Sequence, residues 1–567
     1  MARGIEQRID EYVQNVIANG TIPEDGIITD PKQKIELFTT WGADLWKNFP
    51  AYEVRKGLEY FNNKYFDSPY DINKFNFACF SFFTTFKEDY QQCWDRDFPF
   101  VLTVPNKTGS FEYKVDFKLL AEYIKQKGGY FFVKNNIFLY NSDLSIYEIV
   151  SNDELRGYIM DFVNALNCTL AKTSGIDGAL KDVKSDSEHK IDFNAFNADR
   201  NIINFQNGIL HLDTMALTPH SPDVLSTIQI PCNWNAEDKD LACPVFDGYL
   251  NDLSNGDSEI IRFLWQYIGL AISNIPGYIT KQALFIYGEP NTGKSKIFDL
   301  LAKLLGNNNY TVTELSDLEG DFGTYSLLNK RLAGSPDMSY LNVTELRIFK
   351  QLTGGDDIKF KEKYKSPFDG KYKGVLLFCA NDMPKFGGDK GEATYSRMII
   401  IKCTNVIPKE KQDKSLIDKI YSERAAIVYK AVQALKQFIS NGYRFDIPSV
   451  CESETRKYKL DNDNVMQFLD ECTMLRQAQY KSYLDNCTAA NIYTAYTRWV
   501  KNNGEKYQAP KSEFIKTACR FYGFGDKEDI KHKYNGGRYY KFTLKTEYYN
   551  LIGFPDLSSE DQHIKAV

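Results

Sequence analysis

The residues whose types and spacing best suit chemistry lie between positions 283 and 304. The loop there consists of Gly288, Glu289, Pro290, Asn291, Thr292, Gly293, Lys294 and Ser295, which is the pattern G-x-x-x-x-G-K-S. Five mostly apolar residues, 283–287, precede this loop, and apolar residues recur at helical spacing after it. The order strand, loop and helix is the context in which this pattern binds nucleotide phosphates.

Each part of the 288–295 loop has a role in phosphate chemistry. Backbone N–H groups surround phosphate oxygens, and the positive end of the following helix adds to the attraction. Lys294 is expected to contact the β- and γ-phosphates, and the Ser295 hydroxyl to bind Mg²⁺. We therefore expect ATP and Mg²⁺ as cofactors, with a chance glycine-rich turn as the alternative.

A nucleotide site of this kind needs a second acid to hold Mg²⁺ and to orient water. Asp337 is the best candidate, because it ends a predicted short strand in the stretch 329–337. We expect Asp337 and Ser295 to share the metal. The alternative is an aspartate that only caps a helix.

Two further polar residues complete the candidate catalytic set. Asn381 directly follows the apolar run 374–380, which is typical of a buried central strand, and its amide would position water or contact the γ-phosphate. Arg397 follows 16 residues later, and such an arginine can complete the nucleotide site of a neighbouring subunit. A turn asparagine and a surface salt bridge are the respective alternatives.

Lysines and aromatic residues alternate between positions 358 and 373. There are 6 lysines and 2 acids from Lys359 to Lys373, and the pattern predicts a hairpin with its tip near residues 366–370. Lysines suit the phosphates of a single DNA strand and rings suit its bases, although lysines also protect exposed edge strands. The candidate DNA contacts are Lys361, Lys363, Lys365, Phe368 and Lys371.

The C-terminal part of the chain carries a local excess of positive charge. Residues 498–545 contain 12 Lys and Arg against 5 Asp and Glu, in a chain whose net charge is −6. Three predicted helices followed by a hairpin indicate a winged helix, with Lys531, Lys533 and Arg538 as candidate contacts to duplex DNA. A protein-binding role is the alternative.

This set of motifs resembles superfamily 3 helicases. More narrowly, it is similar to the phage/plasmid and poxvirus-type primase–helicase family, which includes replication initiators of phage satellites such as staphylococcal pathogenicity islands. The stretches that carry the resemblance are 196–227, 288–295, 330–337, 349–356, 376–386 and 396–401.

The resemblance implies an ATP-hydrolysing DNA helicase and replication initiator of a mobile element, phage or phage satellite. Such a protein forms a homo-oligomeric ring, a hexamer, that moves 3′ to 5′ on single-stranded DNA and opens forked DNA. Asn381 would be its γ-phosphate sensor and Arg397 its arginine finger in trans. One departure is that Pro336 and Met338 flank Asp337 where the family usually has two adjacent acids.

The expected fold is multidomain α/β: an AAA+-like P-loop NTPase core with a mainly parallel sheet, α+β domains before it and a winged helix after it. The expected domains are an N-terminal domain at 1–130, a pre-helicase α+β domain at 131–270, the helicase core at 271–447, a linker at 448–464 and the winged helix at 465–567. The linker is expected from its polar composition.

Composition limits the other possibilities. The 11 cysteines are scattered without any C-x-x-C pair and there are 5 histidines, which favours free thiols over a zinc site. No signal core or apolar run of spanning length is present, so we expect a cytoplasmic protein with no membrane partner. The resemblance implies that the cytoplasm is that of a bacterial host cell.

Two other functions stay open from the sequence. The chain could be a DNA-binding initiator whose ATPase only switches assembly, or a bifunctional primase–helicase. For the latter, Asp95 and Asp97 form a D-x-D pair, but no third carboxylate or histidine follows at a useful spacing. A charged turn is the better explanation of that pair, so we expect a helicase without primase activity.

Overall fold

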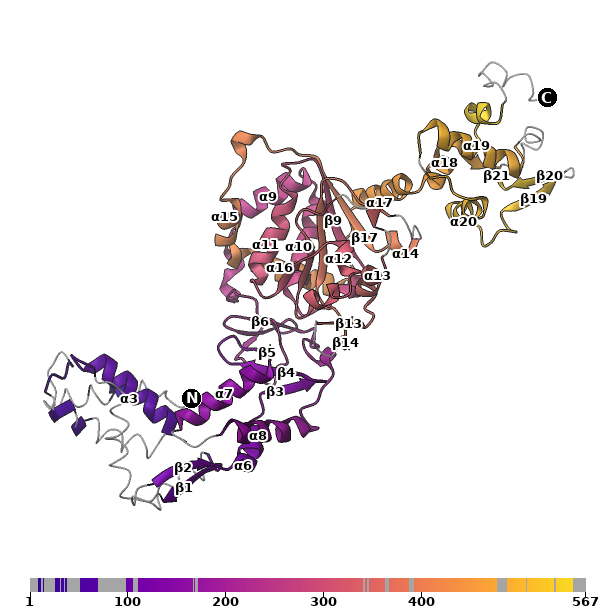
Figure 1. Ribbon diagram of the computed structural model, residues 1–567. Coiled ribbons are helices and arrows are strands. Elements are labelled where there is room, and N and C mark those ends of the chain that lie inside the picture. The colour runs from indigo at the N-terminus through magenta and orange to yellow at the C-terminus, as the bar shows by residue number, and fades with distance from the viewer. Residues whose placement is uncertain are drawn as a thin grey trace. The chain divides into compact units, whose positions relative to one another are not determined.

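The computed structural model separates the chain into two compact units (Figure 1). One unit contains residues 1–141 and 147–192, and the other contains 142–146 and 193–567. The boundary at 193 falls inside the expected 131–270 domain. The structure describes residues 9–11, 14, 26–30, 32–34, 36–37, 51–69, 98–105, 111–166, 168, 172–339, 342–343, 346–362, 367–386, 392–476, 487–505, 507–534 and 537–553.

The first unit combines short antiparallel strands with helices, two of which begin with a side-chain cap. The Asp116 carboxylate accepts from the amides of Lys118 and Leu119, and Ser151 and Glu154 form a reciprocal capping box. Asp95 and Asp97 lie outside the described residues. The elements are α3 (Ala51–Tyr65), β1 (Val101–Pro105), β2 (Phe111–Val115), α6 (Phe117–Lys127), β3 (Tyr130–Val133), β4 (Asn136–Asn141), β5 (Ile146–Val150), α7 (Asn152–Ala165) and α8 (Thr173–Ser185).

The second unit begins with a three-stranded antiparallel sheet. Its strands are β6 (Ile202–Phe205), β7 (Gly208–His211) and β8 (Leu217–Thr218). The Asn207 side chain exchanges two hydrogen bonds with the backbone of Trp234, which fixes the turn between β6 and β7.

A five-stranded, all-parallel sheet forms the centre of the second unit, which confirms the expected α/β class. Its order is β10–β11–β15–β9–β17. The strands are β9 (Ala283–Gly288), β10 (Tyr310–Val312), β11 (Leu332–Ser335), β15 (Val375–Ala380) and β17 (Met398–Cys403). Every residue of β11 and β15 is buried, as their apolar composition requires of a sheet covered on both faces.

Helices cover this sheet and share one large apolar core with it (Figure 1). Helices α10, α11 and α16 contribute to this core. Phe349 of α13 lies outside it and packs edge to face on Phe285 of β9. The helices are α9 (Pro244–Ser254), α10 (Ser258–Ile272), α11 (Lys294–Leu305), α12 (Leu315–Leu318), α13 (Arg347–Gly354), α14 (Glu392–Tyr395), α15 (Leu416–Ser422) and α16 (Arg424–Ser440). Short strand pairs β12 (Asn342–Val343) with β16 (Lys385–Phe386), and β13 (Ile358–Phe360) with β14 (Phe368–Gly370), lie between them.

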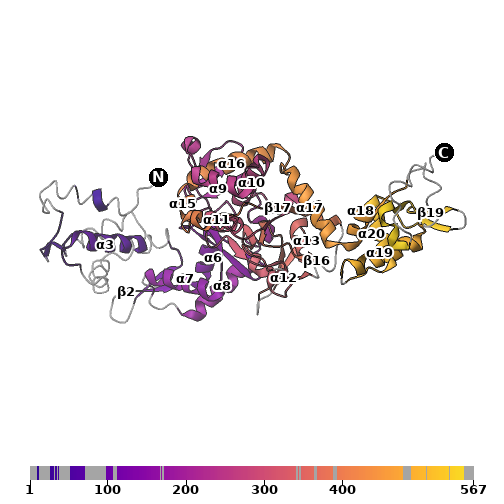
Figure 2. The ribbon, with the colours of Figure 1, turned by 90° about the horizontal axis from the view of Figure 1, so that it is seen from above.

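The segment 448–464 differs from the expected linker. Residues Ser449–Asn462 form the helix α17, which packs along the edge strand β17 (Figure 2). Its average composition is polar, but Cys451, Tyr458 and Asn462 are buried. A single buried face is sufficient to fix a helix, and composition alone does not reveal such a face.

Residues 464–553, here called the C-terminal module, have their own apolar core. Helices α18, α19 and α20 pack with a β18–β21 pair and a β19–β20 hairpin. The elements are α18 (Asn464–Cys472), β18 (Thr473–Leu475), α19 (Ala489–Asn502), α20 (Lys511–Tyr522), β19 (Lys531–Tyr534), β20 (Gly537–Tyr540) and β21 (Phe542–Leu544).

Among the residues that the structure describes, there is neither a membrane-spanning helix nor a disulfide bond. Each helix there is too short or too polar to span a bilayer. Every cysteine placed by the structure is unpaired and buried.

Arg331 is a charged side chain in the core, with 2% of its surface exposed. Its guanidinium donates to the carbonyls of Leu270 and Ala271 at the end of α10, at 2.7 and 3.2 Å, and to that of Ile275 at 3.0 Å. It also donates to the carbonyl of Lys373. Burial lowers the pKa of Arg331 to about 10. The side chain thus satisfies carbonyls that a helix end leaves open and ties α10 to the starts of β11 and β15.

Replacement of Arg331 by methionine should destabilise the second unit by about 3 kcal/mol or more, since several buried carbonyls lose their donors together. Chemical denaturation followed by tryptophan fluorescence measures this loss. Arg347→Met, at an exposed position on α13, is the matched control and should change the unfolding free energy by less than about 0.5 kcal/mol. Equal effects of the two substitutions would contradict the role given to Arg331.

Candidate functional site

The backbone register of the parallel sheet places three candidate residues at one edge. Tyr287 pairs with Ala380, and Ser335 pairs with Phe378. Strands β9, β11 and β15 therefore end side by side, at what is here called the carboxyl edge of the sheet. The 288–295 loop, Asp337 and Asn381 directly follow these three ends, and such an edge is where open α/β sheets bind ligands.

Gly288 begins the loop in a conformation that only glycine tolerates there. Its φ is 136°, and a Cβ at this position would lie 2.1 Å from the carbonyl oxygen of Cys403. Its amide donates to the carbonyl of Asn381 at 3.3 Å. The first glycine of the pattern thus lets the loop cross closely over the ends of β15 and β17.

The start of α11 is open to an anion. Gly293 occupies the N-cap position with φ 81° and has no side chain to satisfy the first amides of the helix. Lys294 is only 6% exposed, and its Nζ donates to the carbonyl of Glu289 at 3.1 Å across the loop. Thr292 donates to the same carbonyl at 3.0 Å. Open amides and a lysine folded over the loop fit a phosphate group.

Two residues that sequence reasoning missed donate hydrogen bonds to backbone carbonyls of the loop. The Tyr249 hydroxyl on α9 donates to the carbonyl of Gly293 at 3.1 Å, and the Cys379 thiol on β15 donates to that of Lys294 at 3.2 Å. Burial raises the pKa of both groups, so both remain protonated donors. No local pattern marks either residue as part of the loop.

Asp337 and Asn381 are both exposed at the carboxyl edge. The Asp337 amide donates to Ser335 Oγ at 3.3 Å, and the next amide, of Met338, donates to the carbonyl of Cys379 at 2.6 Å. These bonds hold the turn after β11 against the end of β15. The backbones of Asp337 and Asn381 therefore lie at the edge of the sheet where the 288–295 loop begins.

Glu314 is a second acid at this edge, and it follows the end of β10. Its carboxylate accepts from the backbone amide of Ser339 at 3.1 Å and from its hydroxyl at 2.8 Å. The expected pair of adjacent acids is absent from the sequence at Asp337, but the fold brings Glu314 to the same turn. Strand pairing between β10 and β11 is the signal that sequence reasoning lacked.

Arg397 lies at the opposite edge of the sheet from these residues. Its carbonyl accepts from the amide of Ala283 at 2.8 Å, at the start of β9. Met398 pairs with Ala283, so Arg397 lies opposite Gln282, and the loop begins six residues beyond Gln282, about 20 Å away. The Nε of Arg397 is buried without a hydrogen-bond partner, and one Nη donates to the carbonyl of Ala393. The structure thus does not bring Arg397 to the loop of its own chain.

The predicted hairpin at 358–373 exists, but its tip is earlier than expected. β13 and β14 are antiparallel, with Phe360 paired to Phe368, so the connection spans 361–367. Phe368 is 2% exposed and packs on Phe193 and Phe360, which contradicts its assignment as a DNA contact. From its alternating position in the sequence, Phe368 could equally stack on a DNA base or pack in the core. The contact with Phe193, which is distant in sequence, shows that it packs in the core.

The lysines of this hairpin have different surroundings. Lys363 and Lys365 lie outside the described residues. Lys361 is half-buried, and Lys371 donates to the carbonyl of Gly355 at 2.8 Å. Lys359 pairs with Asp369 across the two strands at 3.2 Å.

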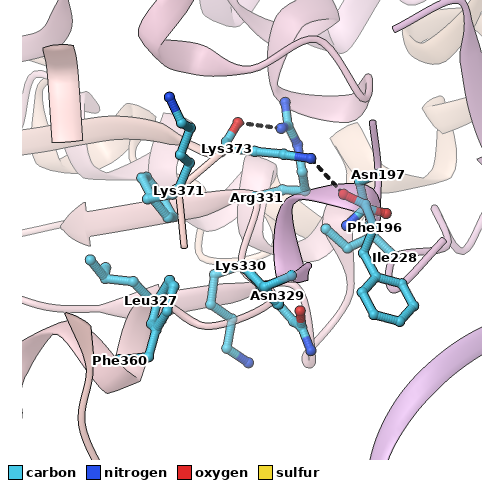
Figure 3. Close-up of a pocket in the computed structure, with 12 residues that line it drawn as sticks. Phe196, Asn197, Ile228, Leu327, Asn329, Lys330, Arg331, Phe360, Lys371 and Lys373 are labelled. Carbon is cyan, nitrogen blue, oxygen red and sulfur yellow. Dashed lines mark hydrogen bonds between the residues drawn. The ribbon is translucent and has the colours of Figure 1, made fainter. Parts of the chain in front are cut away.

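A small pocket beneath the hairpin is rich in cationic side chains. Figure 3 shows Lys373 between Arg331 and Phe196, with Lys330 and Lys371 pointing to opposite sides. Lys373 donates to the carbonyls of Asn194 and Phe196 at 2.8 and 2.5 Å. Its charge is therefore used to hold the hairpin on the segment before β6.

The three C-terminal candidates lie on the β19–β20 hairpin. Lys533 is the register partner of Arg538, and the Arg538 side chain is exposed. Lys531 donates to Glu528 at 2.6 Å.

Comparison with known families agrees with part of the resemblance in the motifs. Residues 125–255 match the family described as D5 N terminal like, and residues 286–397 match a family of unknown function, DUF5906. This pair of regions is typical of phage and plasmid primase–helicase proteins, which indicates a replication enzyme.

Among solved structures, the chain is similar to the apo C-terminal region of NrS-1. One A-form structure has 12% identity and a TM-score of 0.41, and covers 71% of this chain and 86% of that chain. Another apo structure has 11% identity and a TM-score of 0.38, with 76% and 99% covered.

Gly288→Ala should destabilise the second unit by about 3 kcal/mol, because the new Cβ collides with the backbone of Cys403. Chemical denaturation measures this loss of stability. Gly442→Ala is the control, since Gly442 also has a positive φ, 68°, but open space around it. The control should lose only about 1–2 kcal/mol. An equal loss of stability in the two variants would contradict the close approach of Gly288 to Cys403.

Proposed function

We propose that this protein is an ATP-dependent DNA helicase and replication initiator, which works as a homo-oligomeric ring on single-stranded DNA. One observation carries the proposal: the 288–295 loop with Lys294 and the segments with Asp337 and Asn381 follow strand ends at one edge of the sheet, while Arg397 precedes β17 at the opposite edge. A site divided in this way needs two copies of the chain. The sheet order supports an AAA+-like, P-loop type of core.

Each residue has a stated part in ATP hydrolysis. The open amides of α11 and the Lys294 ammonium would hold the β- and γ-phosphates, where Gly288 gives the loop room to close on them. Ser295 and Asp337 would bind Mg²⁺, which neutralises charge on the phosphates when bound. Asn381 would orient the attacking water, and Glu314 is the nearby acid that can support Asp337 in activating it.

The distance of Arg397 from its own loop supports action on a neighbour. Six residues of extended strand separate it from Gly288, about 20 Å, which no arginine side chain spans. In a head-to-tail ring, the edge with Arg397 of one copy faces the carboxyl edge of the next. The proposed ring is a hexamer, as the resemblance implies.

DNA binding is assigned to two surfaces. Lys361, Lys363 and Lys365 in the 361–367 connection would contact the phosphates of the translocating strand, in the 3′ to 5′ direction. Lys531, Lys533 and Arg538 on the β19–β20 hairpin of a winged helix would contact origin duplex DNA. Forked DNA is the expected substrate, and a mobile element, phage or phage satellite replicating in bacterial cytoplasm is the expected context.

Lys294→Ala should lower ATP hydrolysis by about 10²–10³-fold, because the developing phosphate charge loses its closest cation. Unwinding of a labelled fork in ATP and Mg²⁺ should be lost with it. Lys296→Ala, one helical position beyond Ser295 and exposed, is the control and should keep both activities. Unwinding that persists in Lys294→Ala would refute the helicase proposal.

The same assay separates the competing functions. Lys363→Ala/Lys365→Ala should lose unwinding but keep ATP hydrolysis, because only the grip on DNA is removed. Hydrolysis without any unwinding by the unmodified protein would instead support an initiator whose ATPase switches assembly. Primer synthesis from ribonucleotides would support a primase–helicase.

Mixing two inactive variants tests the shared site. Lys294→Ala and Arg397→Ala should each lose hydrolysis, the latter by about 10³-fold or more. A mixture of the two should regain activity, because some interfaces then combine an intact Lys294 with an intact Arg397 from different copies. ATP hydrolysis against mixing ratio is the measurement. No recovery in rings shown to exchange subunits would place Arg397 outside the neighbour's site.

A further inference from the structure

Helix α17 makes polar contacts with the strand that enters the 288–295 loop. Tyr287, the residue directly before Gly288, donates its hydroxyl to Glu454 of α17 at 2.7 Å. Burial raises the pKa of Tyr287, and Glu454 adds to the rise, so the phenol stays a hydrogen-bond donor. The start of the loop is thus anchored to α17.

Two further contacts of α17 reach the other functional segments. Tyr458 donates to the carbonyl of Pro384, three residues after Asn381. Asn462 donates to the hydroxyl of Tyr395 at 2.8 Å, two residues before Arg397. The rings of Tyr395 and Tyr458 also pack edge to face at 5.9 Å.

The three contacts share one face of the helix. Glu454, Tyr458 and Asn462 are each four residues apart, so they lie above one another on successive turns. Covering the edge strand β17 would require only apolar contacts along α17. Three polar contacts, each within three residues of Gly288, Asn381 or Arg397, are more than that cover needs.

We propose that α17 is a positioning helix, which holds the start of the 288–295 loop, the segment after Asn381 and the segment before Arg397 in one fixed arrangement through Glu454, Tyr458 and Asn462. Its effect on catalysis rests on the proposed ATPase function. Reacting groups must be held within about 0.5 Å of their productive positions, which side-chain packing and hydrogen bonds supply.

Helix α17 also connects the parallel-sheet region to the C-terminal module, because it is followed directly by α18. Only Asp463 separates the two helices, and its carboxylate caps α18 by accepting from the amides of Val465 and Met466. The helix that holds the catalytic segments is therefore also the covalent entry to the C-terminal module.

The test uses three substitutions that each remove one hydroxyl: Tyr287→Phe, Tyr458→Phe and Tyr395→Phe, in the full-length protein. Each should lower kcat for ATP hydrolysis about fivefold, the worth of one buried hydrogen bond, with KM for ATP changed less than about twofold. Tyr493→Phe is the matched control. Its hydroxyl donates to the carbonyl of Ala509 at 3.0 Å, away from α17, and its kcat should be unchanged.

Amide hydrogen exchange gives a readout that needs no hydrolysis. Loss of each hydroxyl should speed exchange in the segment it holds: 282–288, 381–386 or 393–398. If the unmodified protein hydrolyses no ATP, the proposed function fails, while segment-specific exchange would still support the positioning role. The positioning role would be overturned if the three variants had the same exchange rates and the same kcat as Tyr493→Phe. It would also be overturned if their kcat fell while KM for ATP rose by an equal factor.

Discussion

The candidate site depends on one constraint, the register of backbone hydrogen bonds between parallel strands. Because Tyr287 pairs with Ala380 and Ser335 with Phe378, three strands end together. Gly288 then brings the loop across these ends, which no residue with a Cβ allows. A shift of one residue in either pairing would move the lysine, the acid and the amide apart. The proposed chemistry is therefore a consequence of sheet geometry.

The opposite edge of the sheet is held by a different interaction. Arg331 binds the carbonyls at the end of α10 and that of Lys373. A charge with 2% exposure is tolerated because each of its three nitrogens donates to a backbone carbonyl. The clamp ties α10 to the starts of β11 and β15, while their far ends carry Asp337 and Asn381. One edge is thus closed by buried hydrogen bonds, and the other carries exposed polar residues.

Helix α17 connects these two edges. Glu454 and Tyr458 contact segments at the carboxyl edge, and Asn462 contacts the segment that precedes Arg397. In the proposed ring, each subunit would serve two nucleotide sites, so the two halves that it contributes would need a fixed relation within the subunit. A rigid helix supplies this relation more directly than the sheet, whose strands separate the halves by about 20 Å.

The sequence by itself determined the features that depend on neighbours along the chain. Strand, loop and helix at 283–304 are contiguous, so their pattern predicted both the local fold and the candidate site, and the apolar runs predicted a parallel sheet that the structure confirms. Tertiary structure alone decided the rest. Tyr249, Glu314 and Arg331 meet their partners across the fold, Phe368 is buried because Phe193 covers it, and α17 is a packed helix because β17 lies beside it. Burial and hydrogen bonding of this kind depend on residues far away in sequence, which local composition does not encode.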